Sequence, residues 1–382
     1  MRALPTERSC PFAPPDGMAD EPAGKVRIST GDEVWLVTRH DLVRQVLGDT
    51  RWSSQIDGGY YDQRLHAVEP MPGMFIQMDP PGHTRLRRLL TGRFTVQRMN
   101  RLRPRIEAIV AERLDALAEA PRPADLVALF ALPIPSLVIC ELLGVPYGDR
   151  EEFQRAGQEL LRLDGSMEAV DAATMQLVAY LMELIGRKQA APGDGLLDEL
   201  LGSGLSDEEL TGVAMLLLIA GHETTANMIS LGTLLLLRRP DQLALVRDSP
   251  EAARTAVDEL LRYLSVVDVG MYRRASADLP IGDLAAREGE FLTASLAAAN
   301  RDPALCERPD ELDVTRPKTP HVAFGFGPHA CLGQNLARLE MEIAYPALLR
   351  RFPGLRLAVP LEEVPFRDNM SIYGVHRLEV DW

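Results

Sequence analysis

The amino-acid sequence predicts a mainly α-helical protein with a small β portion. Apolar residues recur at helical spacing along most of the chain, whereas strand-like runs are few and short. Residues 98–119, for example, place Ile106, Val110 and Leu117 on one helix face. Further helices are expected over about 83–92, 134–143, 150–163, 168–189, 240–247, 251–264 and 334–351. The expected strands are Glu33–Val37, Leu355–Val359 and Tyr373–Val380.

Composition and charge place the chain among ordinary globular proteins. It has 382 residues, of which 46% are apolar and 25% charged, and these values exclude collagen, low-complexity disorder and a coiled-coil rod. Lys and Arg number 41 against 55 acidic residues, a net charge of −14, so nucleic acid is disfavoured as a partner. Because no clear linker or internal repeat is visible, we expect a single domain over residues 1–382.

The cysteines and the apolar runs predict a cytoplasmic protein with no membrane segment. Four cysteines are widely scattered and form no C-x-x-C pair, which fits a reducing compartment. The N-terminal stretch MRALPTERSCPFAPP has no apolar core of signal-peptide length. The longest apolar run, Val213–Ala220, is well short of the roughly 18 residues that a membrane span needs.

Residues 206–238 predict one unusually long helix. Ser206 and Glu209 form a capping box, and Pro240 forbids continuation. At 1.5 Å per residue, such a helix crosses a whole domain. Its middle, Ala220–Thr225, contains glycine and β-branched residues, which are poor helix formers, so we expect a distortion there.

The segment His222–Ala226 begins like the H-E-x-x-H motif of zinc proteases. Ala226 stands where the second zinc-binding histidine would be, so the metalloprotease interpretation fails. Glu223 lies between apolar turns, where burial is costly without a partner or a role. Glu223 and Thr224 are therefore a candidate pair for relaying protons or positioning water. The alternative is a solvated glutamate beside two ordinary threonines.

The sequence FGFGPHACLG, residues 324–333, is the strongest local signal. Gly325, Gly327 and Gly333 allow a tight loop to approach another group closely. Cys331 lies just before a predicted helix, where free amides and the helix dipole favour a thiolate, a ligand for soft metals. An isolated cysteine is usually just buried, but the surrounding pattern favours a ligand.

A dinucleotide-binding loop is a rival interpretation of the same segment. Gly325, Gly327 and Ala330 formally fit G-x-G-x-x-G/A. However, Pro328 occupies the phosphate loop, and about 50 residues remain, too few for the rest of a nucleotide-binding sheet. We therefore set this alternative aside.

Two further signals are weak when taken alone. Glu259 and Arg262 lie one helical turn apart, as many surface pairs do. His83 and Arg87 share a helix face and could hold a carboxylate, although a plain basic surface is the usual meaning of such a pattern.

In this order and spacing, the motifs resemble the cytochrome P-450 superfamily of heme-thiolate monooxygenases. The resemblance covers essentially the whole chain and is most specific at FGFGPHACLG, the cysteine-ligand loop. AGHETT resembles the oxygen-binding groove of the long central helix, and ELLR the E-x-x-R pair. Bacterial members of the family have similar segments at the positions where this chain has HTRLRRLL, AANRDP and PDELDVTR. The resemblance implies a P-450 fold in which heme lies between the long central helix and the cysteine loop.

The resemblance also implies roles for individual residues. Cys331 would be the proximal ligand of the iron of heme b (iron protoporphyrin IX). Glu223 and Thr224 would be the catalytic acid–alcohol pair. Glu259, Arg262 and Arg316 would form a buried structural triad. The other residues expected to contact the heme are His83, Arg87, Ala220, Gly221, Arg273, Phe324, Gly325, His329 and Gly333, among which His83, Arg87, Arg273 and His329 would bind its propionates.

The activity implied is insertion of one oxygen atom from O2 into a bulky, largely apolar natural product of macrolide or polyketide type. Electrons would come from a separate ferredoxin and ferredoxin reductase, docking on Arg85, Arg88 and Arg338. Alternatives are phenol coupling, desaturation or peroxide-driven oxidation on the same fold, and a non-enzymatic heme sensor or carrier. By family position, the pocket is expected to involve 54–78, 153–180, 266–272 and 369–374 and to offer Met71, Met74, Phe75, Val266, Val267, Met271, Met370 and Ile372.

Overall fold

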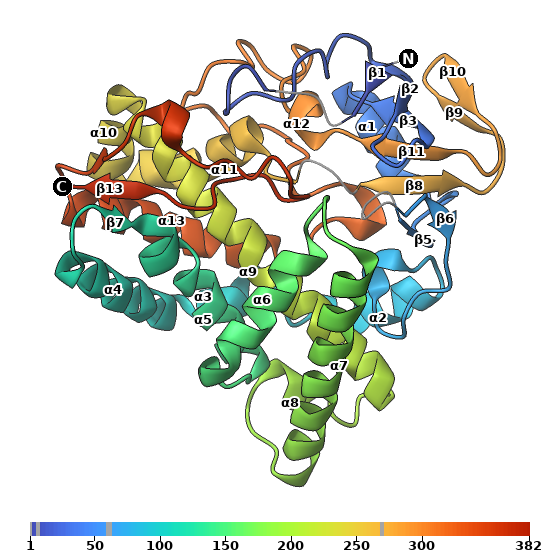
Figure 1. The fold of residues 1–382 in the computed structure, drawn as a ribbon, viewed down its shortest axis with the longest axis horizontal. Coiled ribbons are helices and arrows are strands. Elements are labelled where there is room, and N and C mark those ends of the chain that lie inside the picture. The colour runs from blue at the N-terminus through green and yellow to red at the C-terminus, as the bar shows by residue number, and fades with distance from the viewer. Residues whose placement is uncertain (1, 5–7, 59–62, 268–270) are drawn as a thin grey trace.

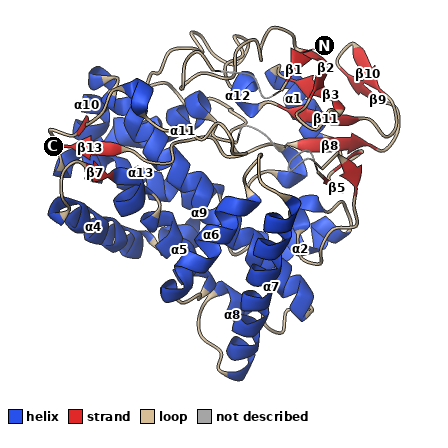
Figure 2. Ribbon diagram, viewed as in Figure 1, coloured by secondary structure: helices blue, strands red, loops and turns tan. Residues whose placement is uncertain are grey.

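The computed structural model describes residues 2–4, 8–58, 63–267 and 271–382. Helices fill most of the molecule, and most strands gather on the side that holds the N-terminus (Figure 1, Figure 2). The predicted fold class, mainly α with a small β portion, is confirmed. The helices are α1 (His40–Gly48), α2 (Gly82–Thr91), α3 (Val96–Asn100), α4 (Arg103–Glu119), α5 (Pro133–Leu143), α6 (Arg150–Leu160), α7 (Met167–Ala190), α8 (Leu196–Leu200), α9 (Asp207–Leu237), α10 (Pro240–Asp248), α11 (Pro250–Leu264), α12 (Leu296–Ala299) and α13 (Gln334–Arg351).

Helix α9 is the centre of the molecule and packs against α5, α6, α7, α11 and α13 (Figure 1). The predicted capping box begins it, since Ser206 Oγ accepts from the Glu209 amide at 3.2 Å and Glu209 Oε2 accepts from the Ser206 amide at 3.1 Å. The helix continues without a break through Ala220–Thr225. The expected distortion therefore does not interrupt it, because packing by its neighbours outweighs weak local propensity.

The predicted helix over 98–119 is two helices in the structure. Thr95 caps α3, and a short turn then separates it from α4, which has Pro104 in its first turn. The predicted apolar stripe is nevertheless correct, since Ile106, Val110 and Leu117 are all buried. The helical spacing of apolar residues correctly predicted the buried face of α4. The break between α3 and α4 depends on the geometry of the turn, which that spacing does not show.

The β portion is larger than the sequence indicated. A six-stranded sheet has the order β1-β2-β3-β11-β8-β4, and a three-stranded sheet has the order β12-β13-β7. Strand β3 is confirmed, but in Tyr373–Val380 only Glu379 and Val380 belong to a strand, and Val375 forms an isolated bridge with Phe366. The four-residue β8 was missed because its sequence YRRA shows no apolar alternation. The strands are β1 (Arg2–Ala3), β2 (Ala23–Arg27), β3 (Glu33–Val37), β4 (Trp52–Ser53), β5 (Ile56–Asp57), β6 (His66–Ala67), β7 (Ala124–Asp125), β8 (Tyr272–Ala275), β9 (Leu279–Ile281), β10 (Leu284–Ala286), β11 (Phe291–Ala294), β12 (Arg356–Leu357) and β13 (Glu379–Asp381).

Helix α7 is the one helix in the described part of the chain that is long and apolar enough to cross a bilayer by length and composition. Such a helix alone is weak evidence for a span. It packs on α6 and α9 and buries Leu177 and Leu181, and Lys188 near its end pairs with Asp198 at 2.6 Å. A charged residue such as Lys188 is costly in lipid. The contacts with α6 and α9 explain the apolar residues of α7 as the inner face of a helix at the periphery of the fold.

A buried ion pair joins α11 to the segment that precedes the cysteine loop. Arg262 is fully buried and donates to both carboxylate oxygens of Glu259 at 2.8 Å. It also donates to the carbonyls of Asn300 at 2.9 Å and Pro309 at 2.7 Å, and Arg316 donates to Glu259 at 3.2 Å. The structure thus brings together the three residues that the family resemblance assigned to a structural triad.

Glu259→Gln should destabilise the protein by about 3–5 kcal/mol, because it leaves the Arg262 guanidinium buried without a carboxylate. The matched control is Glu311→Gln, which breaks an Arg–Glu pair of the same spacing with Arg308 whose side chains are 60% and 64% exposed. That change should cost less than about 1 kcal/mol. Urea unfolding measures both, and equal losses would contradict a special role for the buried pair.

Candidate active site

The loop that contains Cys331 is fixed by backbone contacts. The Cys331 amide donates to the carbonyl of Phe324 at 2.8 Å and closes the loop. Gly325 and Gly327 have φ values of +70° and +73°, where side chains are disfavoured. A Cβ at Gly327 would also clash with the carbonyl of Leu47 in α1. Two of the predicted glycines are therefore required by the shape of the loop.

The surroundings of the Cys331 sulfur shift the pKa of its thiol in opposite directions. Burial raises the pKa of the Cys331 thiol, whereas the amides of Gly333 and Gln334 and the charges of Arg87 and Arg338 act to lower it. The amides at the helix start therefore act in the predicted direction, while burial is the larger effect on the free thiol. A coordinated metal cation deprotonates a thiol outright, and these amides would then stabilise the resulting charge.

Two histidines predicted to bind the cofactor lie against each other. The rings of His83 and His329 are 4.1 Å apart, and His329 Nε2 is 3.1 Å from Ser54 Oγ. Burial, assisted by Arg273, His83 and Arg87, lowers the pKa of His329 to about 3. Burial also lowers the pKa of His83, so both rings are neutral at pH 7. The buried Nε2 of His83 has no hydrogen-bond partner among the described residues.

Two arginines complete this cluster. Arg273 is 7% exposed and donates to the carbonyl of Tyr272 at 2.7 Å, and Arg87 donates to the carbonyl of Ala330. Burial lowers the pKa of Arg273 to about 10. In the described part of the chain, neither guanidinium has a carboxylate within ion-pair distance. Arg273 is a buried cation without an anionic partner, which is costly, and Arg87 is a partly buried one, so the cluster suits an anionic ligand.

One stripe of α9 is open although most of the helix is buried. Ala220 is exposed, and Leu216 and Thr224, four residues to either side, are partly exposed. Gly221 lies differently, because a Cβ there would be 2.8 Å from Ile139 of α5. The open stripe therefore presents Ala220 and Thr224, whereas Gly221 allows α5 to pack closely.

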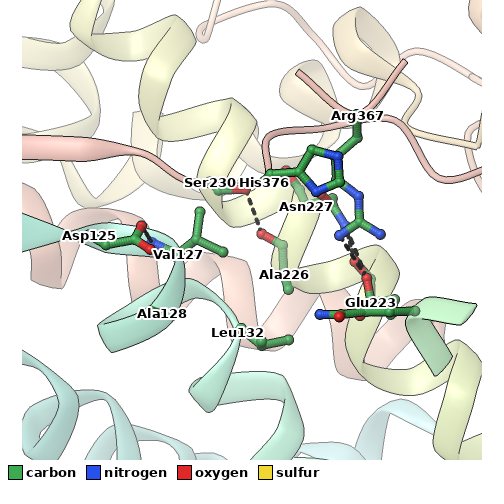
Figure 3. A pocket seen from close by; sticks show the side chains of 11 residues that line it. Asp125, Val127, Ala128, Leu132, Glu223, Ala226, Asn227, Ser230, Arg367 and His376 are labelled. Atoms are coloured by element: carbon green, nitrogen blue, oxygen red, sulfur yellow. Dashed lines mark hydrogen bonds and ion pairs between the residues drawn. The ribbon is translucent and has the colours of Figure 1, made fainter. Parts of the chain in front are cut away.

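The side chains of Glu223 and Thr224 point in different directions in the structure. The Glu223 carboxylate is fully buried and pairs with Arg367 of the C-terminal segment, with Oε2 2.9 Å from Nη1 (Figure 3). The Thr224 hydroxyl instead donates to the carbonyl of Ala220 at 3.0 Å. Adjacent helix residues point about 100° apart, so the two members of the predicted pair face different sides of α9.

Arg367 was missed by sequence reasoning, because nothing in its local sequence links it to α9.

Other predicted site residues lie as follows. The guanidinium of Arg338 lies 4.5 Å from the ring centroid of Phe324, the aromatic residue of the cysteine loop. In the predicted pocket, Val267 forms a bridge with Ile372. Parts of two predicted pocket segments, residues 59–62 and 268–270, lie outside the described residues.

Comparison with known proteins decides the family. A family model described as Cytochrome P450 matches residues 251–377. Pentalenic acid synthase from Streptomyces avermitilis is 46% identical over 392 residues, covering 100% of this chain and 97% of the relative. The chain belongs to the cytochrome P450 family. The crystal structure of CYP105P1 in complex with filipin I has a TM-score of 0.95 at 44% identity and covers 100% of this chain and 98% of that chain. That of the mycinamicin VIII C21 methyl hydroxylase MycCI from Micromonospora griseorubida has a TM-score of 0.91 at 39% identity and covers 100% of both chains.

As a P450, the protein is a heme-iron oxygenase that acts on small molecules with O2. The residues of the site fit the heme. Cys331 offers a sulfur ligand at the start of α13. Arg87, Arg273 and the unpartnered His83 Nε2 match what two propionate carboxylates require. Ala220 leaves a small side chain on the open stripe of α9.

Arg273→Met should release heme about tenfold faster than the parent protein, since a charge-assisted hydrogen bond is lost. Transfer of heme to an excess of apomyoglobin, followed by absorbance, measures the rate. Arg274→Met is the control, because successive residues of a strand point to opposite faces of the sheet. Equal rates for the two variants would remove Arg273 from the heme site.

Proposed function

We propose that this P450 is a monooxygenase that inserts one oxygen atom from O2 into a bulky, largely apolar natural product by hydroxylation or epoxidation. The observation that supports this most is the position of Thr224, whose hydroxyl lies on the open stripe of α9 beside the small Ala220. A hydroxyl placed there can deliver protons for oxygen reduction. We also propose that the chain acts as a single catalytic domain in the cytoplasm.

Each residue has a distinct task in this proposal. The heme, when bound, supplies the redox chemistry of oxygen activation. Cys331 holds the iron, and Arg87 and Arg273 hold the propionates. Thr224 can turn its hydroxyl from the Ala220 carbonyl and hold a proton at Oγ1. Glu223 supplies protons from the far side of α9, which requires its side chain to rotate.

The substrate class is supported by the apolar character of the predicted pocket residues. Phe75, Val266 and Ile372 are buried in the main hydrophobic core, and Met71 and Met74 are partly buried against it. Thioether side chains adapt to irregular apolar shapes. The names of relatives include pentalenic acid, filipin I and mycinamicin VIII. We propose a macrolide-like or polyketide-like natural product on these grounds.

Electrons are proposed to come from a ferredoxin and its reductase, although the expected docking face is narrower than the sequence indicated. Arg85 forms an ion pair with Glu209, and Arg338 is held by Asp258 at 2.8 Å. Arg88 is exposed on α2 and is the best placed of the three to meet an acidic partner.

The function is tested by screening natural-product libraries for compounds that shift the absorption spectrum of the heme-loaded protein. Binders are then incubated with NADPH, a surrogate ferredoxin and its reductase, and the products are analysed by mass spectrometry. A product heavier by one oxygen atom supports the proposal. Coupled, desaturated or strictly peroxide-dependent products, or binding without any turnover, would overturn it in favour of the corresponding alternative.

Thr224→Ala should lower product formed per NADPH by about tenfold and raise peroxide release, because proton delivery is impaired. Thr233→Ala is the matched control, since the hydroxyl of Thr233 also donates to the carbonyl four residues earlier on α9, at 2.7 Å. Coupling should stay at the parent level in that variant. If Thr224→Ala remained fully coupled, Thr224 would have no part in oxygen reduction.

A further inference from the structure

The carboxylates of Asp258 and Glu259 are neighbours on α11 but serve different parts of the fold, because successive helix residues point about 100° apart. Glu259 forms the buried pair with Arg262. Asp258 instead accepts from Arg338 of α13, with Oδ1 2.8 Å from Nε. The helices α11 and α13 pack against each other. Asp258 therefore links α11 to the helix that begins just after Cys331.

Arg338 lies over the aromatic residue of the cysteine loop. Its guanidinium carbon is 4.5 Å from the ring centroid of Phe324, within the range of a cation–π contact. The carbonyl of Phe324 in turn accepts from the Cys331 amide at 2.8 Å. Burial raises the pKa of the Cys331 thiol, and the charge of Arg338 is among the effects that act to lower it. The cation, the ring and the sulfur-bearing residue are therefore one connected unit.

Asp258 is the one anionic partner of Arg338 in the part of the chain that the structure describes. The other acceptors of the guanidinium are the backbone and side-chain oxygens of Gln334, at 3.4 and 3.1 Å, which are neutral and lie on the same helix. An arginine side chain has many rotamers, and that of Arg338 is 21% exposed, so water competes for its charge. The Asp258 carboxylate is therefore what keeps the guanidinium over Phe324.

The Asp258 carboxylate is itself fixed in place. His321 Nδ1 accepts from the Ala323 amide at 3.2 Å, which leaves the proton on Nε2, and Nε2 donates to Asp258 Oδ1 at 3.2 Å. The His321 side chain is 3% exposed, and its ring centroid lies 6.2 Å from that of Phe324. Although burial acts to raise it, the hydrogen bonds from His321 and Arg338 hold the pKa of Asp258 well below its ordinary value, so the carboxylate is charged at pH 7. One carboxylate thus orients both side chains that flank the Phe324 ring.

We propose that Asp258 is a positioning residue that, by holding Arg338 over Phe324, sets how readily the heme accepts an electron. The inference rests on the proposed function, in which Cys331 holds the iron. When reduced ferredoxin gives one electron to the heme, the ferredoxin is oxidised, the iron goes from ferric to ferrous, and the heme with its thiolate gains one negative charge. A cation held near that thiolate favours the reduced form and so raises the reduction potential.

Arg338→Met tests the charge. It keeps an unbranched side chain and removes the cation, so the equilibrium between reduced and oxidised heme should shift about tenfold toward the oxidised form, a fall in midpoint potential of about 59 mV. Arg338→Lys should recover at least half of that fall, because an ammonium can still pair with Asp258. Spectroelectrochemical titration of the heme-loaded protein, without substrate or redox partner, measures both. Equal potentials in Arg338→Met and the parent protein would overturn the inference.

Asp258→Leu tests the positioning. It removes both acceptor oxygens at a similar side-chain size, so the Arg338 guanidinium is released toward solvent and the potential should again fall. A carboxylate that acted through its own charge would have the opposite effect, because its removal raises the potential, so a rise would contradict the proposal. In the Arg338→Met background, Asp258→Leu should cause no further fall, since the two residues act as one unit. A second fall of the same size would show that Asp258 does not act through Arg338.

Glu342→Gln is the matched control, because it breaks another ion pair of α13, with Arg103, in which the Glu342 side chain is 27% exposed against 21% for Asp258. The potential of this variant should equal that of the parent protein. Heme content and thermal unfolding are measured on every variant. If Asp258→Leu does not fold, Asp258→Ala takes its place, because alanine suits a helix and cannot crowd its neighbours. Lower stability with an unchanged potential would mean that the pair only joins α11 to α13, and would overturn the inference.

The outcomes separate this inference from the proposed function. If the reduced parent protein with carbon monoxide bound lacked the absorption band of a thiolate ligand, the proposed role of Cys331 in holding the iron would fall. If the parent protein had that band, but Arg338→Met and Asp258→Leu left the potential unchanged, the function would stand and the positioning role of Asp258 would be wrong.

Discussion

Buried positive charge beside Cys331 is the constraint on which this structure depends. Arg273 is buried and Arg87 is partly buried; among the described residues their hydrogen-bond partners are backbone carbonyls, and the two neighbouring histidines are neutral. A fold that holds cations in this way gains stability from a ligand that carries carboxylates, because binding removes the cost of unpaired charge. Heme provides two carboxylates and an iron atom at once. The polypeptide around the site is thus complementary to heme before any reaction begins.

Helix α9 separates two tasks by its geometry alone. The residues Glu223 and Thr224 are adjacent in sequence but about 100° apart around the helix axis. One therefore faces Arg367 and a polar cavity, whereas the other belongs to the open stripe with Ala220. The ion pair with Arg367 holds the Glu223 carboxylate on the side of the helix away from that stripe.

Local sequence predicted much of this molecule, and distant contacts account for what it missed. The capping box of α9, the apolar face of α4 and the glycine loop were all recognisable, because each depends on residues close in sequence. Strands β8 and β11 are four residues long and gain their stability from partners far along the chain. For the same reason Arg367 was not predicted as the partner of Glu223. The burial that opposes the helix-start amides at Cys331 is likewise a property of the folded state, which the local sequence does not show.

The central claim is that the sulfur of Cys331 binds heme iron in a fold whose charges were arranged to receive that heme. The most direct test is the absorption spectrum of the reduced protein with carbon monoxide bound. A thiolate ligand predicts the strongly red-shifted Soret band that distinguishes P450 proteins. A band at the position typical of histidine ligation, or a protein that stays colourless when hemin is supplied, would contradict the account.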